Sequence, residues 1–280
     1  MIFLQLDPLF RQAIEEDLGQ GDLTTEAILA NGKAVGVGAK RTQARVLAKE
    51  EFVLAGWQVF VRIFELIGDI DAECYFEDGA FVEPGDLGHL SARPLVLLSG
   101  ERVALNFLQR MSGIATKTRS FVNLVAHTGA KILDTRKTTP LWRKLEKYAV
   151  RLGGGCNHRF GLNDGILIKE NHIQISGGIE KAIEACRSRG SHLQKVEVEV
   201  SDLNQLERAI GAGTDAVLLD NMTPEQILEA VKITNRRCLL EVSGGVNEDN
   251  VVQYAETEVD FISLGVLTHS YRSVDISLLL

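Results

Sequence analysis

The chain has 280 residues, of which 45% are hydrophobic and 24% charged, and its formal net charge is −8 at pH 7. This acidic balance argues against attraction of the whole protein to nucleic acid or to an anionic membrane. Its four cysteines form no C-x-x-C pair, which argues against a zinc site or a disulfide framework and favours a reducing cytoplasm: Cys74, Cys156, Cys186 and Cys238.

The first 112 residues mix helical and strand-like patterns. MIFLQLDPLF (1–10) lacks the basic start of a signal peptide, and no uninterrupted apolar run approaches the roughly 18 residues of a membrane helix. A polar helix, strand-like ARVLAKEEFVLAG (44–56), a helix at 57–68 and a Pro-Gly turn at 84–85 predict a smaller α+β domain over residues 1–112. Residues 100–129 then predict helix in two pieces, with the domain boundary near Ser112 and Gly113.

The second half alternates β-rich runs with helix-like stretches. The spacing of about 20 to 35 residues predicts parallel strands with helical crossovers. Ser201 or Thr223 as N-cap, Pro224 in a first turn and a Gly-Ala-Gly stop at 211–213 support the helices. Six strands are predicted, at 131–137, 165–171, 195–200, 215–221, 237–245 and 260–265.

Two architectures fit this alternation, an open doubly wound sheet and a closed β/α barrel. Nearly every predicted strand ends in polar or glycine residues, and β/α barrels build their active sites from the carboxyl ends of the strands. An open sheet gathers ligands only near its switch point. The pattern therefore favours a barrel over residues 113–280, incomplete because the length is short for eight units.

Positive charge gathers between residues 131 and 172, where nine Lys or Arg stand against four Asp or Glu, a local charge of +5. Arg136 and Lys137 end the first strand of this half, and His158 and Arg159 lie in the glycine-bounded GGGCNHRFG (153–161). Arginine offers a planar fork to a carboxylate or phosphate, and lysine a point charge. A solvent-exposed strand end and a plain helix stop are the structural alternatives.

KVEVEV (195–200) places Lys195, Glu197 and Glu199 on one face of a strand and valines on the other. The charged face should look into the barrel, where Glu199 and Asp220 could bind a metal bridged to phosphates or stabilise a developing positive charge. An internal salt-bridge network with Lys195 is the alternative.

Glycines follow the last two predicted strands, in VSGG (242–245) and SLG (263–265). Late loops of β/α barrels often hold a phosphate through backbone N–H groups. No Ser-His-Asp or Cys-His arrangement is evident, so the sequence predicts a polyanionic substrate and chemistry without a strong protein nucleophile.

Nearly the whole chain resembles the quinolinate phosphoribosyltransferase family. DTRKTTP (134–140), LEKYAVR (145–151), NHR (157–159) and LIKENHI (167–173) match the family signature. EDLGQGDLTTEAI (16–28), GERVALNFLQRMSGIAT (100–116), VEVEV, LLDNM, EVSGG and ISLGVLTHS also match, in order.

The resemblance implies transfer of phosphoribosyl from phosphoribosyl pyrophosphate to quinolinate with decarboxylation. The products are nicotinate mononucleotide, pyrophosphate and CO2, in de novo NAD synthesis with Mg²⁺. It further implies an N-terminal α/β sandwich domain (1–112), an incomplete TIM-like barrel (113–280) whose last residues pack back on the first domain, a cytoplasmic location, and a homodimer or larger assembly.

The resemblance also assigns site residues. Arg136, His158 and Arg159 match positions that hold the two carboxylates of quinolinate, with Thr135 among the substrate-binding residues. Lys137 and Lys169 match basic residues of the substrate and pyrophosphate sites, and Arg102 matches an arginine supplied by the neighbouring subunit. Glu199 and Asp220 match carboxylates near the ribose and metal, and the loops around the 5-phosphate correspond to Ser243, Gly244, Gly245 and Gly265.

One departure and two alternatives accompany this reading. Many relatives have Gly-Leu after TTP, where this chain has Leu141 and Trp142, which we expect to alter packing near the site. A branch of the family linked to molybdate transport typically departs from KENHI, which is intact here at 169–173. A Schiff-base barrel lyase with Lys169 as nucleophile is the other alternative.

Overall fold

The computed structural model describes residues 5–30 and 40–280, which form two compact units. Unit 1 comprises the described residues up to Lys117 together with Lys144–Gly153 and Tyr271–Leu280. Unit 2 comprises Thr118–Arg143 and Gly154–Ser270. Across the described residues, we find no helix with both the length and the apolar character needed to cross a bilayer.

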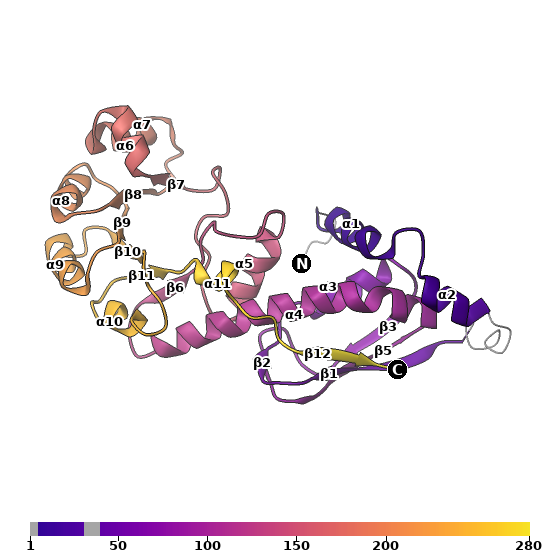
Figure 1. The fold of residues 1–280 in the computed structure, drawn as a ribbon. Coiled ribbons are helices and arrows are strands. Elements are labelled where there is room, and N and C mark those ends of the chain that lie inside the picture. Colours follow the sequence, from indigo (N-terminus) through magenta and orange to yellow (C-terminus); the bar gives the residue numbers. More distant parts are fainter. Residues whose placement is uncertain (1–4, 31–39) are drawn as a thin grey trace. The chain divides into compact units, whose positions relative to one another are not determined.

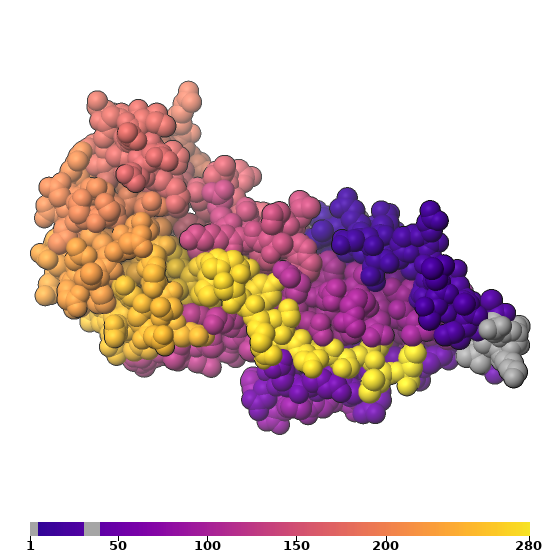
Figure 2. Space-filling model, in the orientation of Figure 1, coloured from indigo at the N-terminus to yellow at the C-terminus, as the bar shows by residue number. Residues whose placement is uncertain are grey.

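Unit 1 is built on an antiparallel sheet of four strands in the order β12-β1-β5-β3. These strands are β1 (Thr42–Ala48), β3 (Ile70–Cys74), β5 (Gly85–Ala92) and β12 (Ile276–Leu279). The short strands β2 (Phe52–Val53) and β4 (Phe81–Val82) pair with each other. The last strand, β12, lies beside β1, so the end of the chain completes the sheet that its first strand begins (Figure 1; Figure 2, in yellow).

Helices α1 (Asp7–Leu18), α2 (Leu23–Ala30) and α3 (Trp57–Glu65) belong to the same unit. Apolar side chains recur along α3 at helical spacing, and those of Val59, Phe60, Ile63 and Phe64 are fully buried. Phe60 meets Phe64 edge-on, with ring centroids 5.2 Å apart. These residues make α3 the centre of the unit's apolar core.

Residues predicted as two helical pieces form one helix, α4 (Pro94–Leu124), of 31 residues. The prediction was wrong because Gly113 is not a helix break. It lies where the backbone of Arg272 and Ser273 passes so close that any Cβ would clash with the Arg272 carbonyl. Glycine is used here for close backbone approach, at a small cost in helix propensity.

Unit 2 contains the six predicted strands, all parallel, in the order β6-β11-β10-β9-β8-β7 (Figure 1). Since β6 and β7 end the order, the sheet is an incomplete barrel, as predicted. Cys156 adds one bridge beside Leu133 of β6. The strands are β6 (Lys131–Leu133), β7 (Ile166–Ile168), β8 (Val196–Val200), β9 (Ala216–Asp220), β10 (Leu239–Ser243) and β11 (Phe261–Ser263).

Helices lie between successive strands and form the crossover connections that parallel strands require. Thr223 caps α9 in a capping box with Pro224 in the first turn, as predicted. Helix α8 is capped by Asp202 rather than Ser201, because the Asp202 carboxylate accepts the Gln205 N–H at 2.8 Å. The helices are α5 (Arg143–Leu152), α6 (Glu170–Ser176), α7 (Ile179–Arg189), α8 (Leu203–Gly211), α9 (Pro224–Thr234), α10 (Val251–Ala255) and α11 (Val266–His269). Of α5, only Arg143 belongs to unit 2.

Leu141 occupies the turn before α5 with φ +68° and a side chain that is 78% exposed. The expectation that this departure alters packing near the site is therefore not met by Leu141 itself, whose side chain faces solvent. A positive φ is a conformation that glycine adopts freely and other residues adopt at a cost. The position thus explains why the family pattern has glycine there.

We predict that Leu141→Gly leaves the free energy of unfolding within about 1 kcal/mol of the parent, because relief of the left-handed strain offsets the greater freedom of the unfolded chain. Leu141→Val should instead destabilise by roughly 1–2 kcal/mol, since a β-branched side chain fits this φ worst. Urea denaturation of the three proteins measures the order. A valine variant as stable as the glycine variant would show that the turn relaxes without strain.

Candidate active site

The carboxyl ends of the parallel strands bring together every predicted site residue except Arg102. Thr135, Arg136 and Lys137 follow β6, Lys169 follows β7, and Glu199 lies in β8. Asp220 ends β9, Ser243 to Gly245 end and follow β10, and Gly265 follows β11. His158 and Arg159 reach the same edge because Cys156 bridges the end of β6. Arg102 is an exposed residue of α4 in unit 1.

Two loops carry the cations. In the 134–138 loop, the Arg136 and Lys137 side chains are exposed, and neither makes a hydrogen bond or ion pair with the residues that the structure describes. In the 157–161 loop, Arg159 is half-buried and donates to the Gly165 carbonyl at 2.9 Å. Burial lowers the pKa of Arg159, and the nearby positive charge of Arg136 lowers it further. Two guanidinium groups therefore share one small region.

Asp134, the first residue of the 134–138 loop, links this loop to the 157–161 loop. Its carboxylate is fully buried and accepts hydrogen bonds from the His158 backbone N–H at 2.9 Å and from Asn157 Nδ2 at 2.6 Å. The sequence analysis missed this role. The available signal was an acidic residue directly after a buried strand, which must be paired to be stable there.

His158 uses both ring nitrogens within the protein. Nδ1 accepts the Arg159 backbone N–H at 2.7 Å, which assigns the proton to Nε2. Nε2 faces Glu197 Oε2 at 3.1 Å and Glu241 Oε2 at 3.6 Å. In this arrangement His158 orients the backbone of Arg159.

Glu197 and Glu241 were not among the predicted site residues. Glu241 is 3% exposed, and burial raises its pKa to about 8, with the neighbouring Glu197 carboxylate adding to the shift. Each of His158, Glu197 and Glu241 offers one atom that could ligate a metal ion, and these three atoms lie within 4.8 Å of one another. In the described part of the chain, this is the one group of three or more such side chains. We assign a shared proton to this cluster, because a neutral Glu241 relieves the repulsion between the two carboxylates.

Lys169 and Glu199 form an ion pair with Nζ and Oε2 2.7 Å apart. The Lys169 backbone N–H donates to His172 Nδ1 at 2.9 Å, which fixes the start of α6. The alternative network around Lys195 does not form: no ion pair links Lys195 to either glutamate of β8 within residues 5–30 and 40–280. Glu197 and Glu199 both point away from the buried valines, as predicted.

The glycines of VSGG have the backbone that a cradle requires. Gly244 and Gly245 have φ +94° and +67°, and a Cβ on Gly244 would clash with the Asn221 side chain. Gly265 lies against the Lys137 side chain, where a Cβ would stand 2.9 Å from Cδ. The positive φ thus favours glycine at Gly244 and Gly245, whereas at Gly265 an added Cβ would displace the Lys137 side chain.

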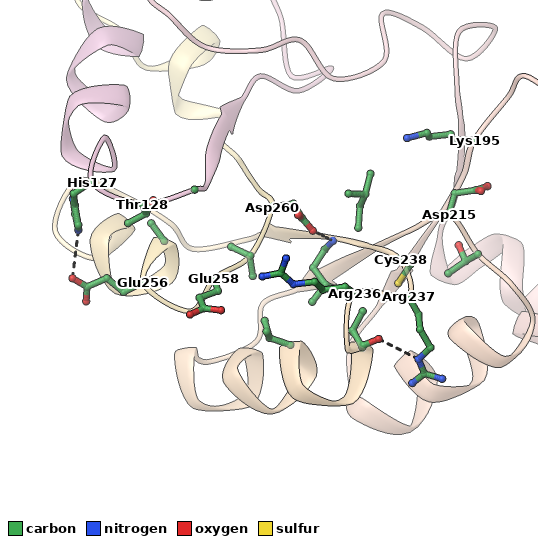
Figure 3. Close-up of a pocket in the computed structure, with 18 residues that line it drawn as sticks. His127, Thr128, Lys195, Asp215, Arg236, Arg237, Cys238, Glu256, Glu258 and Asp260 are labelled. Atoms are coloured by element: carbon green, nitrogen blue, oxygen red, sulfur yellow. Dashed lines mark hydrogen bonds and ion pairs between the residues drawn. The ribbon is translucent and has the colours of Figure 1, made fainter.

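A cavity of about 1000 Å³ lies at the opposite, amino-terminal end of the strands (Figure 3). Several of the charged groups that line it have partners: His127 faces Glu256 at 3.5 Å, Asp215 pairs with Arg187, and Asp260 accepts the Leu240 N–H. Chemistry in β/α barrels sits at the carboxyl end, so we place the candidate site there despite the size of this cavity.

The positive run 131–172 divides between the two units. Lys144, Lys147 and Arg151 of α5 belong to unit 1. Lys131 begins β6 and so lies at the amino-terminal end of the strands. The candidate site therefore draws on the remaining five cations: Arg136, Lys137, Arg143, Arg159 and Lys169.

Comparison with known proteins identifies relatives along almost the full chain. Residues 22–112 match the model of the quinolinate phosphoribosyl transferase N-terminal domain, and residues 114–279 match that of the C-terminal domain. A probable nicotinate-nucleotide pyrophosphorylase [carboxylating] of Bacillus subtilis (strain 168) is 42% identical over 280 residues, covering 99% of this chain and 94% of the relative.

Two further proteins are similar to this chain over nearly its full length. A nicotinate-nucleotide pyrophosphorylase [carboxylating] of Mycobacterium leprae (strain TN) is 41% identical over 276 residues, covering 96% of this chain and 94% of the relative. The crystal structure of NadC from Streptococcus pyogenes has a TM-score of 0.93 at 39% identity, covering 99% of this chain and 96% of that chain.

Glu241→Gln should remove a pH dependence of stability. The ordinary pKa of this carboxyl is 4.5 and the folded value is about 8, so between these values the folded state binds more protons than the unfolded state. The parent's free energy of unfolding should therefore fall as pH rises through that window, by up to about 1.4 kcal/mol per pH unit from this group.

Urea denaturation across the window measures this effect. The stability of Glu241→Gln relative to the parent should rise steadily with pH, whereas exposed Glu207→Gln should give a constant difference. A flat difference for Glu241→Gln would show that the Glu241 carboxyl ionises normally.

Proposed function

The chain belongs to the quinolinate phosphoribosyltransferase family, and on this premise we propose that it converts quinolinate and phosphoribosyl pyrophosphate to nicotinate mononucleotide, pyrophosphate and CO2, in NAD biosynthesis. The observation that supports the proposal is the gathering of cations, carboxylates and glycine loops at the carboxyl ends of the barrel strands.

Quinolinate carries two adjacent carboxylates, and two guanidinium groups suit them. Among the described residues the Arg136 side chain has no hydrogen-bond or ion-pair partner, and the Arg159 side chain is held near it by its bond to the Gly165 carbonyl. Each guanidinium can bind a carboxylate through two parallel hydrogen bonds. His158 contributes to this subsite by orienting Arg159, and Thr135 by accepting the Lys137 backbone N–H at 3.0 Å.

The sugar phosphate is assigned to the loops that follow β10 and β11. Ser243, Gly244, Gly245 and Gly265 provide the cradle for the 5-phosphate. Lys137 and Lys169 supply point charges for the pyrophosphate and substrate carboxylates.

The reaction requires the ring nitrogen of quinolinate to attack the anomeric carbon while the bond to pyrophosphate breaks. Pyrophosphate leaves with the bonding electrons, and positive character develops on the ribose. Glu199 and Asp220, at the ends of adjacent strands, are placed to stabilise that charge. The carboxylate next to the ring nitrogen then leaves as CO2. Its electrons pass into the positively charged ring, and a proton takes its place on the carbon.

Magnesium fits the donors present. Glu199 and Asp220 offer carboxylate oxygens, the ligands that Mg²⁺ prefers, and would hold it together with pyrophosphate oxygens. When bound, the ion neutralises charge on the leaving group.

We also propose a homodimer or larger assembly in which Arg102 reaches the neighbouring subunit's site, in the cytoplasm. The motif match of Arg102 and its exposure on α4 support the shared site. The four cysteines, all free thiols, support the reducing compartment.

The surroundings of Lys169 argue against the alternative of a Schiff-base lyase. A Schiff-base lysine must be neutral to attack a carbonyl, whereas Lys169 is ion-paired with Glu199 at 2.7 Å.

The test of the function is direct. Purified protein, quinolinate, phosphoribosyl pyrophosphate and Mg²⁺ should yield nicotinate mononucleotide and CO2 in equal amounts, and nicotinate in place of quinolinate should yield none. Folded protein that forms no product would overturn the proposal and favour a family member repurposed to bind an anion.

We predict that Arg136→Ala and Arg159→Ala each weaken quinolinate binding by roughly 2–4 kcal/mol, because each leaves a carboxylate without its charged partner. Titration calorimetry measures the binding. Arg189→Ala, an exposed arginine at the end of α7, is the matched control and should bind normally. Unchanged affinity in either test variant would remove that residue from the subsite.

Subunit exchange tests the role of Arg102. Arg102→Ala and Lys169→Ala homodimers should each be nearly inactive. Mixed dimers should recover activity, up to about a quarter of the parent at equal mixing, because half of the dimers are hybrid and each hybrid has one intact site. Demonstrably mixed dimers without activity would exclude the shared site.

A further inference from the structure

Arg143 contacts both of the loops that carry Arg136 and Arg159. It is the first residue of α5 and belongs to unit 2. Its guanidinium donates through Nε to Thr138 Oγ1 at 2.9 Å and through one terminal nitrogen to the Phe160 carbonyl at 3.0 Å. The other terminal nitrogen is 3.5 Å from the Arg136 carbonyl. One planar group thus contacts both loops.

The acceptors of Arg143 are all neutral. Within the described ranges it makes no ion pair, so its contacts are directed to a hydroxyl and to backbone carbonyls. The two carbonyls belong to Arg136 and to Phe160, the residue after Arg159. The Phe160 ring adds a contact, with its centroid 6.0 Å from Cζ of Arg143.

The loops need such a link because their charges repel. The positive charge of Arg136 lies close enough to Arg159 to lower the pKa of Arg159, in addition to the effect of burial. Asp134 ties the 157–161 loop to the end of β6 by accepting hydrogen bonds from Asn157 and from the His158 backbone N–H. On the far side of Arg159, the Phe160 N–H donates to Asp164 Oδ2 at 2.6 Å, and the Phe160 carbonyl accepts from Arg143, which links this side of the loop to the 134–138 loop.

We propose that Arg143 is a positioning residue, whose guanidinium sets the spacing between the 134–138 and 157–161 loops and therefore between Arg136 and Arg159. It acts through these two residues and does not touch the substrate. The identity of the anion rests on the proposed function, whereas the effect of Arg143 on the loops does not. Two carboxylates fixed on adjacent ring carbons require a fixed spacing of their partners.

Kinetics of Arg143→Ala provide the first test. We expect the KM for quinolinate to rise about 10- to 100-fold, with a smaller change in the KM for phosphoribosyl pyrophosphate, because misplacement by about 1 Å has costs of this size. Arg143→Lys should retain most of the defect, since an ammonium group cannot bridge both loops. Methylguanidinium added to Arg143→Ala should lower the KM for quinolinate again and should not affect Arg189→Ala.

Thr138 offers a matched pair on the other side of the contact. Thr138→Ser keeps the hydroxyl that accepts from Arg143 and should behave as the parent. Thr138→Val removes it and should raise the KM for quinolinate. In Arg143→Ala, the same valine change should add little, because the contact is already lost.

Hydrogen exchange separates this inference from the proposed function. In Arg143→Ala, backbone amides of residues 136–138 and 158–160 should exchange faster than in the parent, while those of α8 and α9 stay protected. This readout holds even if the parent turns over no quinolinate. Unchanged exchange in both loops would overturn the proposal, as would equal KM increases for both substrates without rescue by methylguanidinium.

Discussion

Repulsion between two guanidinium groups is the constraint on which the arrangement of the candidate site depends. Arg136 lies close enough to Arg159 to lower its pKa, in addition to the effect of burial. Because like charges repel, contacts that the loops make elsewhere must hold the two groups near each other. Asp134 fixes the 157–161 loop from the end of β6, and Glu197 adds a negative charge near Arg159. The Arg159 side of the site is thus held in place, whereas the exposed Arg136 side chain makes no hydrogen bond or ion pair with the described residues.

Much of this arrangement was predictable from the chain itself. Alternation of β-rich and helical runs predicted the six parallel strands, and the polar residues at the strand ends led us to expect the candidate site at their carboxyl ends. The family motifs then pointed to individual residues. Helix boundaries were harder, because they depend on competing local groups. Asp202 and Ser201 could each cap α8, and Gly113 could break α4 or let another segment approach closely.

The partners of the site residues were not predictable, because they come from distant parts of the sequence. His158 meets Glu197 and Glu241 only when β8 and β10 stand near the 157–161 loop. The role of Asp134 likewise depends on the return of the chain along β6. For Glu241, the sequence held one usable signal, an acidic residue inside the apolar strand LLEVS. Buried acids of this kind are rare enough to deserve a place among candidate residues.

The order of the strands also affects how the chain reaches its fold during synthesis. Strand β12 pairs with β1, although these strands stand at opposite ends of the sequence, and the whole of β6 to β11 is made between them. The barrel strands can associate while the ribosome is still working, but the edge of β1 stays open until the last residues emerge. The pairing of β1 with β12 is a contact of long sequence separation, and such contacts form slowly, so β1 is a strand edge open to wrong pairing while the chain is being made.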